Sequence, residues 1–264
     1  MNAWTSALRL GAPSALYPED VLPNVRRLAG LVQNIEWEVF EVTCDTPGPE
    51  ALAEMARLGA AYGHSYTVHL PLDLFLADED EGVRRDSVEL GCRVIARGQL
   101  LNPWAYVVHI KGEGASADWG PWHERAAASL VALGEAAGGC ERLAVENIPR
   151  YPAAHLWPLA ARLPVSLCID AGHLLRQGAD PRPLLGEWLD RVRVIHLHGY
   201  DGHRDHRSLA AMDQGMLLDI LRILYRRRYP GVITIECFQP QAFFDSWDLV
   251  ESLWRRVQRE RETD

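Results

Sequence analysis

Eight short apolar segments, most of them rich in Val, Ile or Tyr, recur along the 264-residue chain. They are too short to form buried helices, and their nearly continuous apolar character is typical of parallel strands that are buried on both faces. The pattern therefore predicts strands over residues 8–11, 35–40, 66–70, 106–110, 142–146, 165–169, 192–197 and 232–236.

Amphipathic stretches separate these segments and carry apolar residues at helical spacing. They predict helices over residues 18–30, 49–62, 83–97, 122–137, 212–228 and 244–259, with shorter ones over 152–161 and 183–189. Eight strand and helix repeats in a chain of this length predict a (β/α)₈ TIM barrel, as one domain over residues 1–264. A doubly wound sheet would need a glycine-rich phosphate-binding turn after the first strand, and Gly11-Ala12-Pro13 is not one.

Composition narrows the range of partners. The 27 Lys and Arg residues against 36 Asp and Glu residues give a net charge of −9, which disfavours a nucleic-acid partner. The five cysteines form no C-x-x-C pair, so they predict free thiols in a reducing compartment. The N-terminus has no secretory pattern, and no apolar stretch is long enough to cross a bilayer. We therefore expect a cytoplasmic protein without a membrane partner.

Acidic residues or histidines stand at the ends of seven of the eight predicted strands. In a barrel these ends open on a single rim, so the side chains should converge. Each has a structural explanation when it is taken alone: a hydrogen-bonded core histidine, a helix cap or an internal ion pair. Together they would repel and desolvate one another without a cation, and borderline metals prefer such mixed ligands. The residues are Glu41, His69, His109, Glu146, Asp170 with His173, His196 with His198, and Glu236.

Two segments are more specific than these single residues. Asp170 and His173 have the spacing that places two side chains on one face at the start of a helix. Residues 195–206 hold four histidines and two aspartates directly after a predicted buried strand. We interpret this segment as a source of metal ligands rather than as a polar surface loop. Glu41 is interpreted as structural or substrate-orienting.

The ordered motifs HLP, VVHI, VEN, CIDAGH, IHLHG, RDHRSL and ITIE resemble the xylose isomerase-like TIM-barrel superfamily, and in layout its endonuclease IV branch (AP endonuclease family 2). That resemblance implies a cluster of up to three zinc ions. Its ligand positions correspond to His69, His109, Glu146, Asp170, His173, His196, His206 and Glu236. The sugar isomerases and epimerases of the superfamily imply a simpler, single-metal site made of Glu146, Asp170, His196 and Glu236.

The chain departs from the DNA-repair pattern. Arg204 stands where the repair enzymes have an aspartate ligand, and Asp205 is displaced from that place by one position. There are also no basic, apolar wedge loops for opening a duplex. The segments RLGAPS, YTVHLPLDL, HLHG and DHRSL are instead similar to the CbiR-type cobamide-remodelling phosphodiesterases.

This second resemblance implies hydrolysis of the nucleotide-loop phosphodiester of adenosylated cobamides, giving cobinamide phosphate and an α-riboside. One to three divalent cations, with zinc favoured over manganese or iron, would neutralise the phosphate and supply hydroxide. We assign catalytic roles to His109, Glu146 and Glu236. The candidate substrate contacts are Glu41, His198, Asp205, Trp119 and Trp122, with Tyr17 and Phe238 as further aromatic residues near the loops.

Three other functions fit the same motifs. A single-metal sugar isomerase or epimerase would use Glu146 and Glu236 for proton transfer and would not need His69, His109 or His206 as ligands. A true apurinic-site endonuclease is disfavoured by the net charge and by Arg204. A non-catalytic corrinoid or sugar-phosphate binder would have no reason to keep a full ligand set. The oligomeric state, including a homodimer, is left open.

Overall fold

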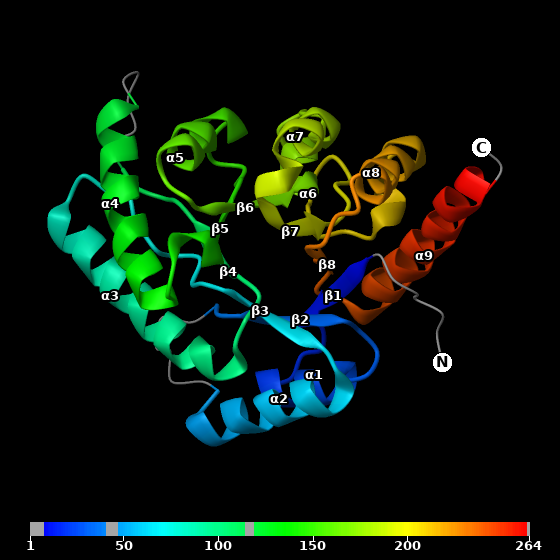
Figure 1. The fold of residues 1–264 in the computed structure, drawn as a ribbon, viewed down its shortest axis with the longest axis horizontal. Helices are drawn as coiled ribbons and strands as arrows, with labels where there is room; N and C mark the ends of the chain where they lie inside the picture. The colour runs from blue at the N-terminus through cyan, green and yellow to red at the C-terminus, as the bar shows by residue number, and fades with distance from the viewer. Residues whose placement is uncertain (1–7, 41–46, 114–118, 263–264) are drawn as a thin grey trace.

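In the computed structural model, which describes residues 8–40, 47–113 and 119–262, the strands pair in chain order and form a closed barrel (Figure 1). Every neighbouring pair is parallel, and β1 completes the ring by pairing with β8. This confirms the predicted (β/α)₈ barrel. The strands are β1 (Arg9–Pro13), β2 (Asn34–Glu38), β3 (Ser65–His69), β4 (Tyr106–His109), β5 (Leu143–Glu146), β6 (Ser166–Asp170), β7 (Val192–Leu197) and β8 (Val232–Ile235).

Helices surround this ring of strands on all sides in Figure 1. They are α1 (Val21–Leu28), α2 (Pro49–Tyr62), α3 (Glu81–Gly98), α4 (Gly120–Ala137), α5 (Trp157–Arg162), α6 (Ala171–Arg176), α7 (Pro181–Trp188), α8 (Gln214–Arg226) and α9 (Pro240–Glu262). Short 3₁₀ turns are η1 (Gln99–Leu101), η2 (Cys140–Arg142), η3 (Ala153–Leu156), η4 (Leu189–Arg191) and η5 (Leu209–Ala211).

The helix boundaries follow local chemistry. Helix α2 has the predicted bounds, with Pro49 at its first position and Gly63 in the left-handed conformation at its end (φ 76°). The stretch predicted over 152–161 is divided between η3 and α5. Helix α6 is absent from the predicted helix ranges, because its six residues are too few to show a helical repeat, but the Asp170–His173 spacing correctly indicated a helix start there. It begins where the Asp170 carboxylate accepts the backbone N–H of His173 at 2.6 Å.

Strand β2 differs from the prediction at its C-terminal end. It ends at Glu38, and Glu41 lies outside the described residues. Alternate residues of β2 point to the barrel interior, and three successive interior positions are polar. The outward positions, including Ile35 and Trp37, join the large core between strands and helices. The interior positions are Asn34, Glu36 and Glu38, all buried.

The interior of the barrel is apolar only in part. A separate small cluster there is formed by Ala105, Val107, Ala144, Cys168 and Val194. The next interior positions toward the C-terminal ends of these strands are histidines or carboxylates, including His109 and Glu146. Polar groups are therefore stacked directly on a layer of small apolar side chains.

Two further observations concern the sequence predictions. Within the described ranges, no helix has the length and apolar character needed to span a membrane. Cys92, Cys140, Cys168 and Cys237 are free thiols, and Cys44 lies outside the described residues.

Candidate metal centre

Glu146, the last residue of β5, lies at the centre of the polar side chains in the barrel mouth. Its Oε2 atom is 3.2 Å from Nε2 of His69 and 3.0 Å from Nε2 of His109. Its Oε1 atom faces the other way, 3.4 Å from Nδ1 of His173 and 3.5 Å from Nδ1 of His196. The two oxygens of one buried carboxylate therefore face two different pairs of imidazoles.

Two further carboxylates lie beside the second pair of imidazoles, His173 and His196. One comes from the end of β6 and the other from the residue after β8. Nδ1 of His196 is 3.3 Å from Glu236 Oε2 and 3.8 Å from Asp170 Oδ2. Nδ1 of His173 is 3.3 Å from the same Asp170 oxygen. One imidazole nitrogen is thus surrounded by oxygens of Asp170, Glu146 and Glu236. This is the mixture of ligands that zinc, manganese and iron accept.

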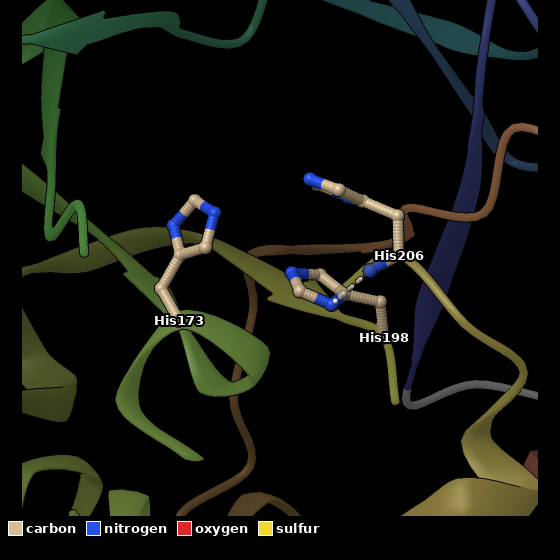
Figure 2. Close-up of side chains that lie close together, drawn as sticks. All are labelled: His173, His198 and His206. Carbon is tan, nitrogen blue, oxygen red and sulfur yellow. Dashed lines mark hydrogen bonds between the residues drawn. The ribbon is translucent and has the colours of Figure 1, made fainter. Parts of the chain in front are cut away.

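A further cluster of candidate ligands consists of three histidines. Figure 2 shows His173, from the start of α6, facing His198 and His206, which lie beyond the end of β7. The backbone N–H of His206 donates to Nδ1 of His198 at 2.9 Å, so Nε2 of His198 is directed toward Asp170 Oδ2 at 3.1 Å. His206 has φ 53°, a left-handed conformation that costs energy for a residue other than glycine. The loop holds this histidine in a strained position.

The ligand atoms of five overlapping sets lie close enough together, within 4.8 Å, to hold a metal ion. All eight residues predicted as metal ligands occur in these sets, together with His198 and Cys168. The sets are His69–His109–Glu146, Glu146–Asp170–His173, Asp170–His196–Glu236, His173–His198–His206 and Glu146–Cys168–His196.

The burial of these groups tests whether a cation fits. Oε1 of Glu146, Nδ1 of His196 and Oε2 of Glu236 are buried and have no hydrogen-bond partner. The imidazole nitrogen is nevertheless 3.5 Å from the Glu146 oxygen and 3.3 Å from the Glu236 oxygen. Buried polar atoms without partners are costly. A cation at their common centre would satisfy all three, so the residues present fit a divalent metal.

The same crowding shifts the protonation equilibria. Burial alone would lower the pKa of His69, but the hydrogen bond to Glu146 and the charge of Glu38 outweigh it and raise the pKa to about 10. For His173, burial is likewise outweighed by Asp170 and Glu146, and the pKa rises to about 10. Burial would raise the pKa of Glu146, yet the adjacent His109 and His196 hold it well below its usual range. Without metal, protons on imidazoles take the place of the cation.

Surrounding side chains hold the candidate ligands in place. Oε1 of Glu36 is 2.8 Å from Nε2 of His196, while its Oε2 accepts the Thr67 hydroxyl at 2.7 Å. Glu36 Oε1 and His196 Nε2 do not have hydrogen-bond geometry, but the negative charge beside Nε2 favours an imidazole proton there and leaves the Nδ1 lone pair for a cation. The Asn147 amide both accepts from and donates to the backbone of Asp170 at 2.9 Å, which fixes the end of β6 against that of β5.

A cavity of about 340 Å³ opens above these groups. Its floor includes His69, Glu146 and Glu236. Three cationic side chains also line it: Lys111, which is mostly buried, and Arg150 and Arg176. Phe40 and Phe238 line it too, with ring centroids 5.9 Å apart in an edge-to-face arrangement. Each cation pairs with a carboxylate, of Asp73, Glu113 and Asp205 respectively, so an anion would have to share it with that partner. The two rings offer apolar faces for a bulky group.

The predicted substrate contacts are only partly brought together. Asp205 lines the cavity, but its carboxylate pairs with Arg176 at 2.6 Å and belongs to none of the metal-binding sets found among the described residues. His198 is fully buried and lies with the candidate ligands instead of on the cavity surface. Trp122 is fully buried in the main core, and Trp119 stacks on His155 with centroids 3.6 Å apart. These two positions give no support to a substrate contact.

Three residues of the site were missed in the sequence. Glu36 and Glu38 were overlooked because the end of the second strand was placed at Glu41; the alternation of polar residues at 34, 36 and 38 was the available signal. Cys168 lies two residues before Asp170 on the same face of β6, and it was interpreted only as a free thiol.

Comparisons with known proteins agree with this architecture. A search of curated proteins finds no match. Solved structures superpose over nearly the whole chain at low identity: a D-tagatose 3-epimerase-like protein (18% identity, TM-score 0.81, 96% of this chain and 99% of that one) and endonuclease IV from Thermus thermophilus (18%, 0.70, 94% and 99%). A third is the IOLI protein with a binding zinc atom (13%, 0.75, 95% and 99%).

These likenesses concern the fold, while a family model is matched by the sequence itself. The model for the xylose isomerase-like TIM barrel matches residues 31–257, which is most of the chain. The chain is therefore a member of the xylose isomerase-like TIM-barrel family.

Proposed function

We propose that this protein is a metal-dependent phosphodiesterase acting on the nucleotide-loop phosphodiester of adenosylated cobamides. The observation that carries the proposal is the position of Glu146, whose two oxygens face separate sets of ligands. A carboxylate in that position suits two cations that share it. Pairs of metal ions bridged in this way are typical of phosphate-ester hydrolysis.

A single-metal sugar epimerase would leave part of this arrangement without a use. Asp170, His196 and Glu236, with one oxygen of Glu146, already supply four ligand atoms around one position. His69 and His109 would then be buried imidazoles on the far side of Glu146 without a ligand role. Both imidazoles are hydrogen-bonded to Glu146, so in a single-metal enzyme they would serve only to hold that carboxylate.

The charge around the cavity also favours an anionic substrate. Lys111, Arg150 and Arg176 line the mouth of a protein whose net charge is −9. A neutral sugar does not need this cationic rim, whereas a phosphodiester is bound and oriented by it. The exposed ring of Phe40 and the nearby Phe238 offer apolar contact for a large flat group such as a corrin or a base.

In this proposal the candidate ligands divide into two sets that share Glu146. His69 and His109 would hold one cation with Glu146, and Asp170, His196 and Glu236 would hold the other. When bound, the cations supply charge neutralisation and hydroxide at neutral pH. Lys111 and the two arginines line the cavity, where they can orient the phosphate. His173 and His206 lie beside the second set; together with His198 they would hold a third cation, or without one an imidazole there can donate a proton to the leaving oxygen.

Incubation of the zinc- or manganese-loaded protein with adenosylated cobamide tests this proposal. Chromatography should show cobinamide phosphate and the free α-riboside. The Glu146→Gln variant, which retains the side-chain shape, should release neither product. Bis(p-nitrophenyl) phosphate, assayed in parallel, separates a general phosphodiesterase from one that needs a corrinoid. Failure to cleave either diester, together with epimerisation of a ketose, would replace the proposal with the single-metal epimerase.

A further inference from the structure

Glu38 is a buried carboxyl group that the proposed metal sites do not use. It ends β2, and only 5% of the residue is exposed. Its backbone N–H donates to the Ser14 hydroxyl at 3.0 Å, which fixes the position of the residue. Its Oε1 atom is buried and has no hydrogen-bond partner. None of the metal-binding sets found in the described parts of the chain includes it.

A buried carboxyl oxygen without a partner is rare in folded proteins, because desolvation is costly whether the group is charged or neutral. The position of Glu38 suggests what would satisfy it. The residue lines the cavity above the candidate metal centre, and it also lines a neighbouring cavity of about 640 Å³ between β2 and α1. Phe40 borders both cavities as well. A molecule bound over the metal centre therefore reaches Glu38 as it extends toward the second cavity.

The chemistry of a carboxyl group indicates which kind of ligand atom could pair with Glu38. Because the unpartnered oxygen of Glu38 belongs to a side chain that lines the cavity, a bound molecule has to satisfy a carboxyl group in whichever protonation form it takes. A hydroxyl satisfies either form, because it donates to a carboxylate and accepts from a carboxylic acid. An ammonium group or a carbonyl oxygen satisfies only one of the two. A hydroxyl is thus the ligand group that fits.

The register of the strands places this hydroxyl relative to the phosphate. Glu38 pairs with His69 across β2 and β3, so the two Cα atoms are about 4.8 Å apart, the spacing between neighbouring strands. A phosphate held beside His69 would then bring the adjacent carbon of its sugar toward Glu38. We propose, on the basis of the proposed function, that Glu38 hydrogen-bonds the sugar hydroxyl next to the scissile phosphate and thereby selects ribose-type esters.

Binding measurements with nucleotides that are not cleaved test this specificity without relying on turnover. The probes are adenosine 3′-monophosphate and 2′-deoxyadenosine 3′-monophosphate, titrated calorimetrically into the zinc-loaded protein. The parent should bind the ribonucleotide about five- to tenfold more tightly, the effect of one hydrogen bond. Glu38→Leu, which fills the same space without polar atoms, should bind both nucleotides equally. Glu38→Gln keeps a donor and an acceptor and should restore part of the preference.

Glu89→Ala is the matched control, because it removes an exposed carboxylate from α3 that lines neither cavity. It should retain the full ribose preference. Equal or undetectable binding of the two nucleotides by the parent protein would overturn the inference, and so would a preference that persists in Glu38→Leu. A ribose preference in a protein that does not cleave cobamide would disprove the proposed function and leave the role of Glu38 intact.

Discussion

Replacing His109 with alanine should separate the two proposed metal sites. Nε2 of His109 is 3.0 Å from Glu146 Oε2, and its Nδ1 atom has no hydrogen-bond partner, so the ring is held mainly by its contact with Glu146. Alanine would leave His69 and one oxygen of Glu146 as the protein ligands on that side. The set formed by Asp170, His196 and Glu236 would stay complete.

The size of the effect follows from the loss of one cation. Charge stabilisation by a catalytic metal contributes several kcal/mol, and each 1.36 kcal/mol changes a rate about tenfold. We therefore expect His109→Ala to reduce the hydrolysis of phosphodiesters by about a hundredfold or more. The fold should be retained, because the ring lies at the mouth of the barrel and adds little to the main core.

Metal content after dialysis and the cleavage rate would be measured on the same preparation. His203→Ala is the control: it removes an exposed imidazole from the histidine-rich segment 195–206, outside the metal-binding sets of the described chain. It should retain the parent metal content and rate. A folded His109→Ala protein that loses one metal equivalent and still hydrolyses at the parent rate would refute the two-metal reasoning, as would one that keeps every equivalent.

Three further predictions concern metal binding. Glu36→Gln should weaken the affinity of the metal held by His196 by about 10- to 100-fold, measured by competition with a chromophoric chelator, because the negative charge beside Nε2 of His196 would be lost. Since the pKa values of His69 and His173 are about 10 in the metal-free protein, above the ordinary value near 6.5, zinc binding between pH 6.5 and 10 should release protons and tighten as the pH rises. Calorimetry in buffers of different ionisation enthalpy counts those protons, and a pH-independent affinity would contradict the raised pKa values. In Gly172→Ala, the new Cβ would lie 2.1 Å from Cε1 of His198, so metal binding by His173, His198 and His206 should be lost while the far-ultraviolet circular dichroism is unchanged.

The barrel was predictable because its signal is repeated eight times. Each buried parallel strand is marked by a continuous apolar run, and errors of one or two residues at the strand ends did not alter the count. Most candidate ligands were predictable for a related reason. Once a strand such as 106–110 is recognised, His109 at its end must lie on the rim.

Other features of the site could not be predicted from the short apolar segments. The error at β2 arose because Val39 and Phe40 extend the apolar pattern past the true end of the strand at Glu38. The burial of Trp122 was not predictable from the sequence. An aromatic residue near the start of a helix can either pack into the core or face a loop, and the sequence pattern is the same in both cases. Which atom of Glu146 faces which histidine depends on side-chain torsions, and no spacing in the sequence specifies those.

The closure of β1 against β8 has a consequence for how the molecule unfolds. The candidate ligands come from six consecutive strands, from His69 on β3 to Glu236 after β8, so the first and the last of them meet only when the ring closes. A bound cation would act as a reversible cross-link between distant parts of the chain. Because such long-range contacts form late in folding, this cross-link should mainly slow unfolding and have little effect on the folding rate. Resistance to proteolysis would then depend on metal supply, and a fragment lacking the last strand would lose that protection entirely.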